Sequence, residues 1–173
     1  MYKIILPTFL DIEASSLGSR SYPIQVAWNS GSGEIYVFLI SPETVPGWTD
    51  WDFKSEKLHG ISKEKLIKEG ENPRSVCNNI IEQLAGKTVY TDNPEFDKFW
   101  MQELFKACRL DFPEIEFKDS NELFLEMLAK NNVLNKKAEL ETLKTKAKQI
   151  SPPNHKAYSD VKYLLALYQL IIE

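Results

Sequence analysis

Two acidic residues, Asp11 and Glu13, lie inside an otherwise apolar segment near the start of the chain, Phe9-Leu10-Asp11-Ile12-Glu13. Apolar and acidic residues alternate from residue 10 to residue 13, which predicts a half-buried β-strand. On a strand, the two carboxylates project from one face, while Leu10 and Ile12 point into the opposite layer. Carboxylates at a buried position cost free energy unless something compensates their charge. The compensation that we expect is a pair of hard divalent cations, which prefer oxygen ligands.

Two later segments add residues of the same chemistry. The segment Asn93-Pro94-Glu95-Phe96-Asp97 places Asp97 in the first turn of a helix that follows a short strand, a position where α/β sheets collect their active sites. The segment His155–Asp160 follows two prolines, so we expect His155 on a loop or at a frayed helix start, and Asp160 near the start of the last helix. Four carboxylates and a histidine suit a two-metal site for in-line displacement at phosphorus. We therefore predict a phosphodiester hydrolase.

The order of the predicted elements indicates the fold. Residues 24–28 and 35–40 read as strands on either side of a hairpin signal at 29–33. Downstream, helical patterns alternate with one more short strand. The strand is expected at 88–91, and helices are expected near 63–69 and 73–84, in two stretches within 121–147, and after residues 152–153. One further helix is expected to begin after Asn93, which is a good N-cap and is followed by Pro94 at the first helical position. We predict a single domain, 1–173, of the α/β class, with a mixed sheet (an antiparallel meander, then parallel strands) flanked by helices.

Charge and cysteine content narrow the class of protein further. The net charge is −4, yet residues 130–156 carry seven lysines against two glutamates. This basic segment could draw a phosphate backbone toward the acidic residues; a solvated lysine-rich helix face is an equally good reading. With only Cys77 and Cys108, buried free thiols in a reducing compartment are expected. The start lacks a signal peptide's long apolar region, and no apolar run could span a membrane, so we expect a cytoplasmic protein.

The three segments together resemble the motifs of the DEDDh family of 3′–5′ exonucleases, which have a ribonuclease-H-like fold. The motifs are Asp-x-Glu at 11–13, Asn-x-x-Phe-Asp at 93–97 and His-x-Ala-x-x-Asp at 155–160, in this order. The segment His59-Gly60-Ile61-Ser62 is similar to a His-Gly-Ile-Thr element of the family. Lys156 stands where a sister subgroup has tyrosine, which indicates the histidine subgroup.

The resemblance implies a role for each of the five residues. Asp11, Glu13, Asp97 and Asp160 would bind two Mg²⁺ or Mn²⁺ ions, and His155 would be the general base. Asp11 would bridge both ions, and Asp97 would act mainly through a coordinated water.

The resemblance also implies a pocket for the terminal nucleotide. Where many relatives follow Asp-x-Glu with Thr-Thr-Gly, this chain has Ala14-Ser15-Ser16-Leu17. Backbone contacts to the nucleotide could survive that change, and Leu17 matches a leucine that wedges between the last two bases in relatives. His59 would have a structural or substrate-lining role. Asn93 fits the family pattern as a substrate contact, although an N-cap role is the simpler reading.

The predicted function is a metal-dependent 3′–5′ exonuclease that acts on single-stranded 3′ ends and releases nucleoside 5′-monophosphates. DNA is slightly favoured by similarity to proofreading-type domains, although nothing in the residues reads the 2′-hydroxyl that distinguishes RNA from DNA. One alternative is an exoribonuclease that trims RNA, like an oligoribonuclease. Another is a non-catalytic subunit that keeps the fold for nucleic-acid binding. The expected partner is nucleic acid, without a membrane, and the sequence does not indicate a protein partner or a homo-oligomer.

Overall fold

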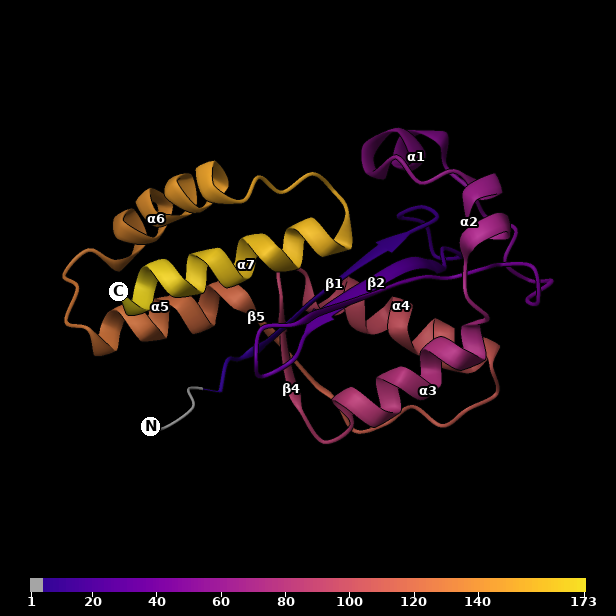
Figure 1. The fold of residues 1–173 in the computed structure, drawn as a ribbon, viewed down its shortest axis with the longest axis horizontal. Helices are drawn as coiled ribbons and strands as arrows, with labels where there is room; N and C mark the ends of the chain where they lie inside the picture. Colours follow the sequence, from indigo (N-terminus) through magenta and orange to yellow (C-terminus); the bar gives the residue numbers. More distant parts are fainter. Residues whose placement is uncertain (1–4) are drawn as a thin grey trace.

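A five-stranded mixed sheet forms the centre of the computed structural model, which describes residues 5–173 (Figure 1). Residues 1–4, which belong to the start for which no signal peptide is expected, lie outside the described residues. The strand order is β3-β2-β1-β4-β5. Strands β1, β2 and β3 are antiparallel neighbours, whereas β4 runs parallel to both β1 and β5. The strands are β1 (Thr8–Ala14), β2 (Pro23–Asn29), β3 (Ile35–Leu39), β4 (Thr88–Thr91) and β5 (Glu116–Asp119).

Seven helices surround the sheet in the described part of the chain. They are α1 (Phe53–His59), α2 (Lys63–Glu69), α3 (Pro73–Leu84), α4 (Pro94–Ala107), α5 (Ser120–Lys130), α6 (Lys136–Ile150) and α7 (Ala157–Ile172). Helices α3 and α4 cover one face of the sheet, and α5, α6 and α7 gather on the other (Figure 1). Strand β1 separates the two cores, because Leu10 and Ile12 pack on the α3–α4 side while Phe9 packs on the α5–α7 side.

The predicted order of strands and helices is confirmed, including the antiparallel meander followed by parallel strands. The sequence did not predict two of the observed elements, helix α1 and strand β5. Helix α1 is only seven residues long, begins at the N-cap Asp52 and buries only His59, so it has no apolar period. Strand β5 has four residues, three of them charged, because it is an edge strand whose side chains are mostly exposed.

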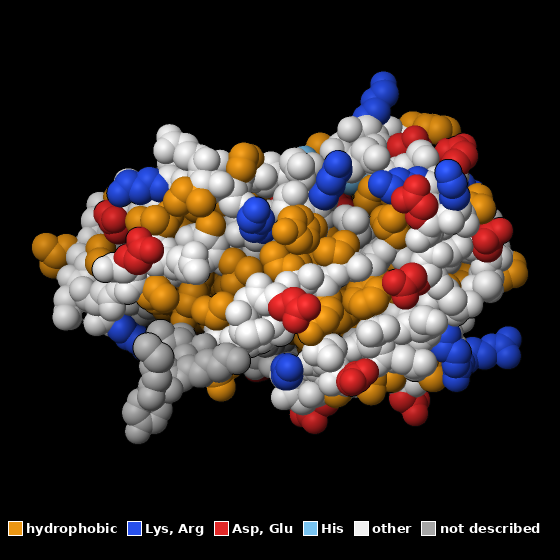
Figure 2. Space-filling model, in the orientation of Figure 1, with side chains coloured by type: hydrophobic (Ala, Val, Ile, Leu, Met, Phe, Trp, Pro, Cys, Tyr) orange, Lys and Arg blue, Asp and Glu red, His pale blue; other side chains and the backbone are white. Residues whose placement is uncertain are grey.

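Strand β3 forms the other edge of the sheet, and its side chains are partly exposed. Figure 2 shows apolar side chains gathered in the middle of the face where α7 lies beside the sheet. Cys77 is buried and Cys108 partly buried, and both are free thiols, as predicted. Within residues 5–173, no helix is both long and apolar enough to cross a membrane.

Candidate active site

Strand β1 holds Asp11 and Glu13 on the face that α7 covers. In the pairing of β1 with β2, Asp11 lies opposite the small residue Ala27 and Glu13 lies opposite Gln25. The register shifts between Glu13 and Ala14, at the end of the strand. The alternation of the sequence therefore places both carboxylates as predicted, and the small partner leaves room above Asp11.

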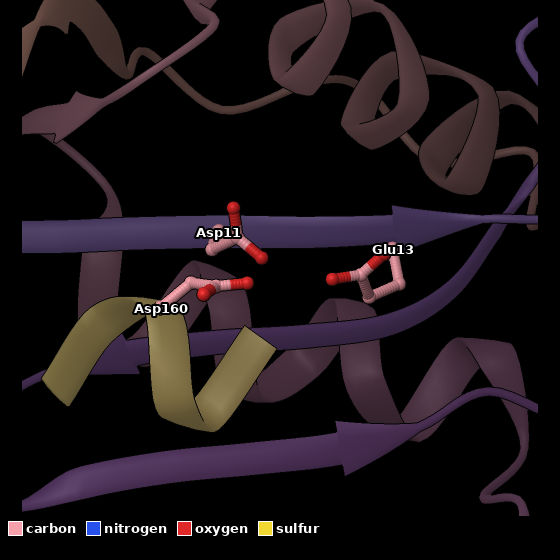
Figure 3. Close-up of side chains that lie close together, drawn as sticks. All are labelled: Asp11, Glu13 and Asp160. Atoms are coloured by element: carbon pink, nitrogen blue, oxygen red, sulfur yellow. The ribbon is translucent and has the colours of Figure 1, made fainter. Parts of the chain in front are cut away.

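The first turn of α7 brings Asp160 to these two carboxylates. The backbone N–H of Ala157 donates a hydrogen bond of 3.0 Å to Oε1 of Gln25 in β2. This buried contact joins the start of α7 to the strand residue opposite Glu13. Carboxylate oxygens of Asp11, Glu13 and Asp160 lie within 4.8 Å of one another. Figure 3 shows the three side chains converging on the space between β1 and the start of α7.

Asp97 lies beside this group, in the first turn of α4. Its side chain is only 3% exposed, and it accepts a hydrogen bond from Oγ1 of the fully buried Thr91, at the end of β4. Helix α4 packs against β1, and the charge of Asp97 raises the pKa of Asp11. Asp97 is outside the group of three that could share one cation. The structure therefore brings all four predicted carboxylates together, three in direct reach of one another and the fourth beside them.

Crowding and burial change the protonation of the group. Burial, followed by the charges of neighbouring carboxylates, raises the pKa of Asp11 well above its ordinary range. Burial and the charge of Asp160 raise the pKa of Glu13 to about 7, and burial raises the pKa of Asp160 to about 6. Burial raises the pKa of Asp97 to about 8, although the hydrogen bond from Thr91 acts in the opposite direction. Without a compensating positive charge, this cluster holds protons near neutral pH.

The donor set fits a hard divalent cation. Oδ2 of Asp11 is buried and has no hydrogen-bond partner among residues 5–173. An unpaired buried carboxylate oxygen costs free energy that a cation would remove. All three residues within mutual reach offer oxygen ligands, which Mg²⁺ and Mn²⁺ prefer over the nitrogen and sulfur ligands typical of zinc sites.

His155 lies on the exposed loop between α6 and α7, as predicted. Its backbone has a φ of 55°, in the left-handed region that histidine adopts more readily than most residues. A cavity of about 420 Å³ is lined by His155 together with Asp11 and Asp160. The charge of His155 lowers the pKa of Asp160, against the effect of burial. His155, Asp11 and Asp160 thus face one solvent-accessible space.

The residues predicted to contact a nucleotide differ in exposure. Leu17 is 72% exposed. Asn93 is also exposed; it occupies the N-cap position of α4, but its side chain makes no capping hydrogen bond. Ala14 and Ser16 are buried, with Oγ of Ser16 donating to Asp50.

Ser15 and His59 are buried more completely. Ser15 is fully buried, its Oγ accepting from the N–H of Tyr22, so in this structure it supports the loop rather than facing solvent. His59 is 2% exposed, and its Nδ1 accepts from the N–H of Ile61. Nε2 of His59 has no hydrogen-bond partner in the described part of the chain.

Three charged residues near the site were not singled out from the sequence. Asp92, at the end of β4, lines the cavity and accepts a hydrogen bond from Oγ of Ser120. Its position just after a strand that runs parallel to β1 was a usable signal, because such strand ends collect functional residues. Lys144 and Lys148 of α6 also line the cavity. No sequence pattern distinguishes these two from the other lysines of residues 130–156.

No protein-family model and no curated protein matches this sequence. Solved structures do match. E. coli exonuclease I in complex with a dT13 oligonucleotide superposes with a TM-score of 0.69 and 21% identity, over 96% of this chain and 41% of that one. The chain shares its fold with exonuclease I.

Two further structures of exonuclease I agree with this match. The zinc-ion-bound E. coli complex with single-stranded DNA has a TM-score of 0.67 and 18% identity, over 95% of this chain and 40% of that one. A product-bound structure has a TM-score of 0.64 and 17% identity, over 95% and 43%. The predicted ribonuclease-H-like fold is therefore confirmed, and the chain spans about two fifths of the length of exonuclease I.

Proposed function

We propose that residues 1–173 act as one 3′–5′ exonuclease domain that hydrolyses phosphodiester bonds at single-stranded 3′ ends and releases nucleoside 5′-monophosphates. The observation that carries the proposal is the convergence of Asp11, Glu13 and Asp160 beside Asp97, at one edge of a cavity that His155 also lines. The fold shared with exonuclease I supports the same activity.

Two Mg²⁺ or Mn²⁺ ions, held by Asp11, Glu13, Asp97 and Asp160, would supply the positive charge that stabilises the transition state at phosphorus. His155 would take the proton of the attacking water, because imidazole accepts protons near neutral pH. Its loop position at the cavity lets it approach the carboxylates from solvent. Leu17 and Asn93, which are exposed, are the residues proposed to meet the terminal nucleotide directly.

Single-stranded DNA is the proposed substrate. Exonuclease I, whose fold the chain shares, is bound to DNA oligonucleotides in several of the matching structures. The carboxylate cluster itself would repel phosphate groups, so we expect nucleic acid to bind there together with cations.

The test is an assay with DNA and RNA oligomers labelled at the 5′ end, each incubated with Mg²⁺, with Mn²⁺ or with chelator. We expect DNA to shorten stepwise from its 3′ end only when a cation is present, with mononucleotides as the product. Faster shortening of RNA would favour the RNA-trimming alternative. No shortening of either polymer, together with cation-dependent binding, would favour a non-catalytic binding subunit.

A further inference from the structure

Two lysines of α6 reach the cavity that contains the proposed catalytic residues. Of the lysines in residues 130–156, only Lys144 and Lys148 line this cavity of about 420 Å³. They enter it from α6, whereas Asp11 and Asp160 enter it from β1 and α7. The cavity therefore has the carboxylates of β1 and α7 on one side and the two ammonium groups on the α6 side, where the carboxylate of Glu141 also lines it.

The packing of α6 determines which lysines these are. Leu140, Leu143 and Ala147 bury one face of the helix against α5 and α7. Lys144 and Lys148 are four residues apart, so they project from the same side of the helix. Lys146 lies between them in sequence, but it is exposed and does not line the cavity.

Degradation from the 3′ end limits which phosphate groups of the substrate these lysines can bind. The terminal nucleotide carries one phosphate, the scissile one, and beyond it there is only a 3′-hydroxyl. Any second phosphate near the site must therefore lie on the 5′ side of the scissile bond. Leu17 and Asn93, the proposed contacts of the terminal nucleotide, do not line the cavity, so it is free for another part of the substrate.

We infer that Lys144 and Lys148 bind the phosphodiester on the 5′ side of the scissile bond, so that the substrate strand leaves the active site over α6. This inference rests on the proposed exonuclease function. It assigns the substrate a direction across the fold: the 3′-terminal nucleoside toward the β1–β2 loop, and the upstream strand between α5, α6 and α7.

The ion pair that Lys144 makes now is no obstacle to this role. Its Nζ lies 3.0 Å from Oε1 of Glu141, on the same helix, and the Glu141 side chain is 72% exposed. Exposed pairs of this kind contribute little, because solvent screens them. Lys144 itself is only 25% exposed, so a phosphate in the cavity would interact with a partly desolvated ammonium group.

The experiment compares oligothymidylates of eight nucleotides in which one phosphodiester is replaced by the neutral methylphosphonate. The replaced linkage is either the one next to the scissile bond or one four linkages further upstream. Release of the first nucleotide is measured as kcat/KM. For the wild-type protein, the neighbouring replacement should lower kcat/KM by roughly 10-fold or more, the effect of losing a charged hydrogen bond. The distant replacement should change it less than about twofold.

The double variant Lys144→Gln, Lys148→Gln decides whether the lysines are responsible. It should cleave the all-phosphate oligomer roughly 10-fold more slowly than the wild type. Replacing the neighbouring linkage by methylphosphonate should then lower the kcat/KM of this variant by less than about twofold. The matched control Lys146→Gln should keep the wild-type response. An unchanged response in the double variant, with normal thermal unfolding, would overturn the inference while leaving the exonuclease function intact. If the wild-type protein releases no nucleotide from any oligomer, the proposed function fails, and the inference fails with it.

Discussion

Gln25 of β2 accepts a hydrogen bond from the backbone N–H of Ala157 in α7, across 132 residues of sequence. The contact is buried, and Gln25 lies opposite Glu13 in the pairing of β1 with β2. Because Asp160 is about one turn further along α7, this contact helps to hold Asp160 near Glu13. The geometry of the carboxylate cluster thus depends on a side chain that belongs to none of the motifs.

We expect Gln25→Met to weaken this positioning. The substitution keeps the volume but leaves the Ala157 N–H buried without a partner, which should lower the free energy of unfolding by about 1–3 kcal/mol. Cation affinity should fall as well, because Asp160 is no longer held. Thermal unfolding and calorimetric titration with Mn²⁺ measure the two effects, and Gln102→Met, on the exposed side of α4, is the control. Unchanged cation affinity would show that α7 is positioned by other contacts.

Thr91→Val should act through Asp97. The hydroxyl of Thr91 lowers the pKa of Asp97, so its removal should raise that pKa further and favour the protonated carboxyl. We expect Mn²⁺ to bind roughly 10–100-fold more weakly at pH 7, as for other residues that orient metal ligands. Thr91→Ser should restore binding. The control Thr88→Val lies on the same strand as Thr91 and loses only an exposed hydrogen bond to Glu116 of β5, so it should leave binding unchanged.

The metal-free protein should lose stability as pH rises. The pKa values of Asp160, Glu13 and Asp97 are raised to about 6, 7 and 8, whereas the unfolded chain has ordinary values near 4. The folded state therefore binds more protons than the unfolded state in this window, and its free energy of unfolding should fall between about pH 4 and pH 8. Mg²⁺ should reverse the trend and stabilise the protein more at pH 8 than at pH 5. Thermal unfolding is measured across this range with and without Mg²⁺, and a flat profile without Mg²⁺ would show that folding does not raise these pKa values.

Asp11→Asn should separate stability from function. Nucleotide release should be lost, because the central carboxylate of the proposed metal site is gone. The metal-free variant should nevertheless melt at a higher temperature than the wild type at pH 8, since a buried carboxylate among other acids is removed. About 1 kcal/mol corresponds to roughly 2–4 °C in a chain of this size. Asp111→Asn, at an exposed position, should change neither property.

His155→Ala should slow nucleotide release by roughly 10²–10⁴-fold if the imidazole is the general base. The positive φ of His155 means that alanine also strains the loop, so His155→Asn is the better comparison. Asparagine tolerates this backbone conformation but cannot take the proton, and it should be as slow as alanine. A near-normal rate in the asparagine variant would assign His155 a role in loop geometry alone.

Local patterns in the sequence were sufficient for most of the secondary structure and for part of the site. Alternation in β1 predicts that Asp11 and Glu13 share a face, and the prolines before α7 predict where that helix begins. These features depend on neighbours within a few residues, so they can be read without the fold. Helix α1 and strand β5 escaped prediction because short elements with exposed side chains have little apolar period.

The convergence of the cluster was decided by tertiary structure. The positions of Asp97 and Asp160 at helix starts, together with the family resemblance, suggested that they meet the carboxylates of β1. The contacts that bring them there are the parallel pairing of β4 with β1 and the bond from α7 to Gln25. The same holds for α6, where the packing of Leu143 and its neighbours selects two of the five lysines of the helix for the cavity. Contacts between residues far apart in sequence depend on strand order and helix packing, and the local periodicity of a chain does not encode these.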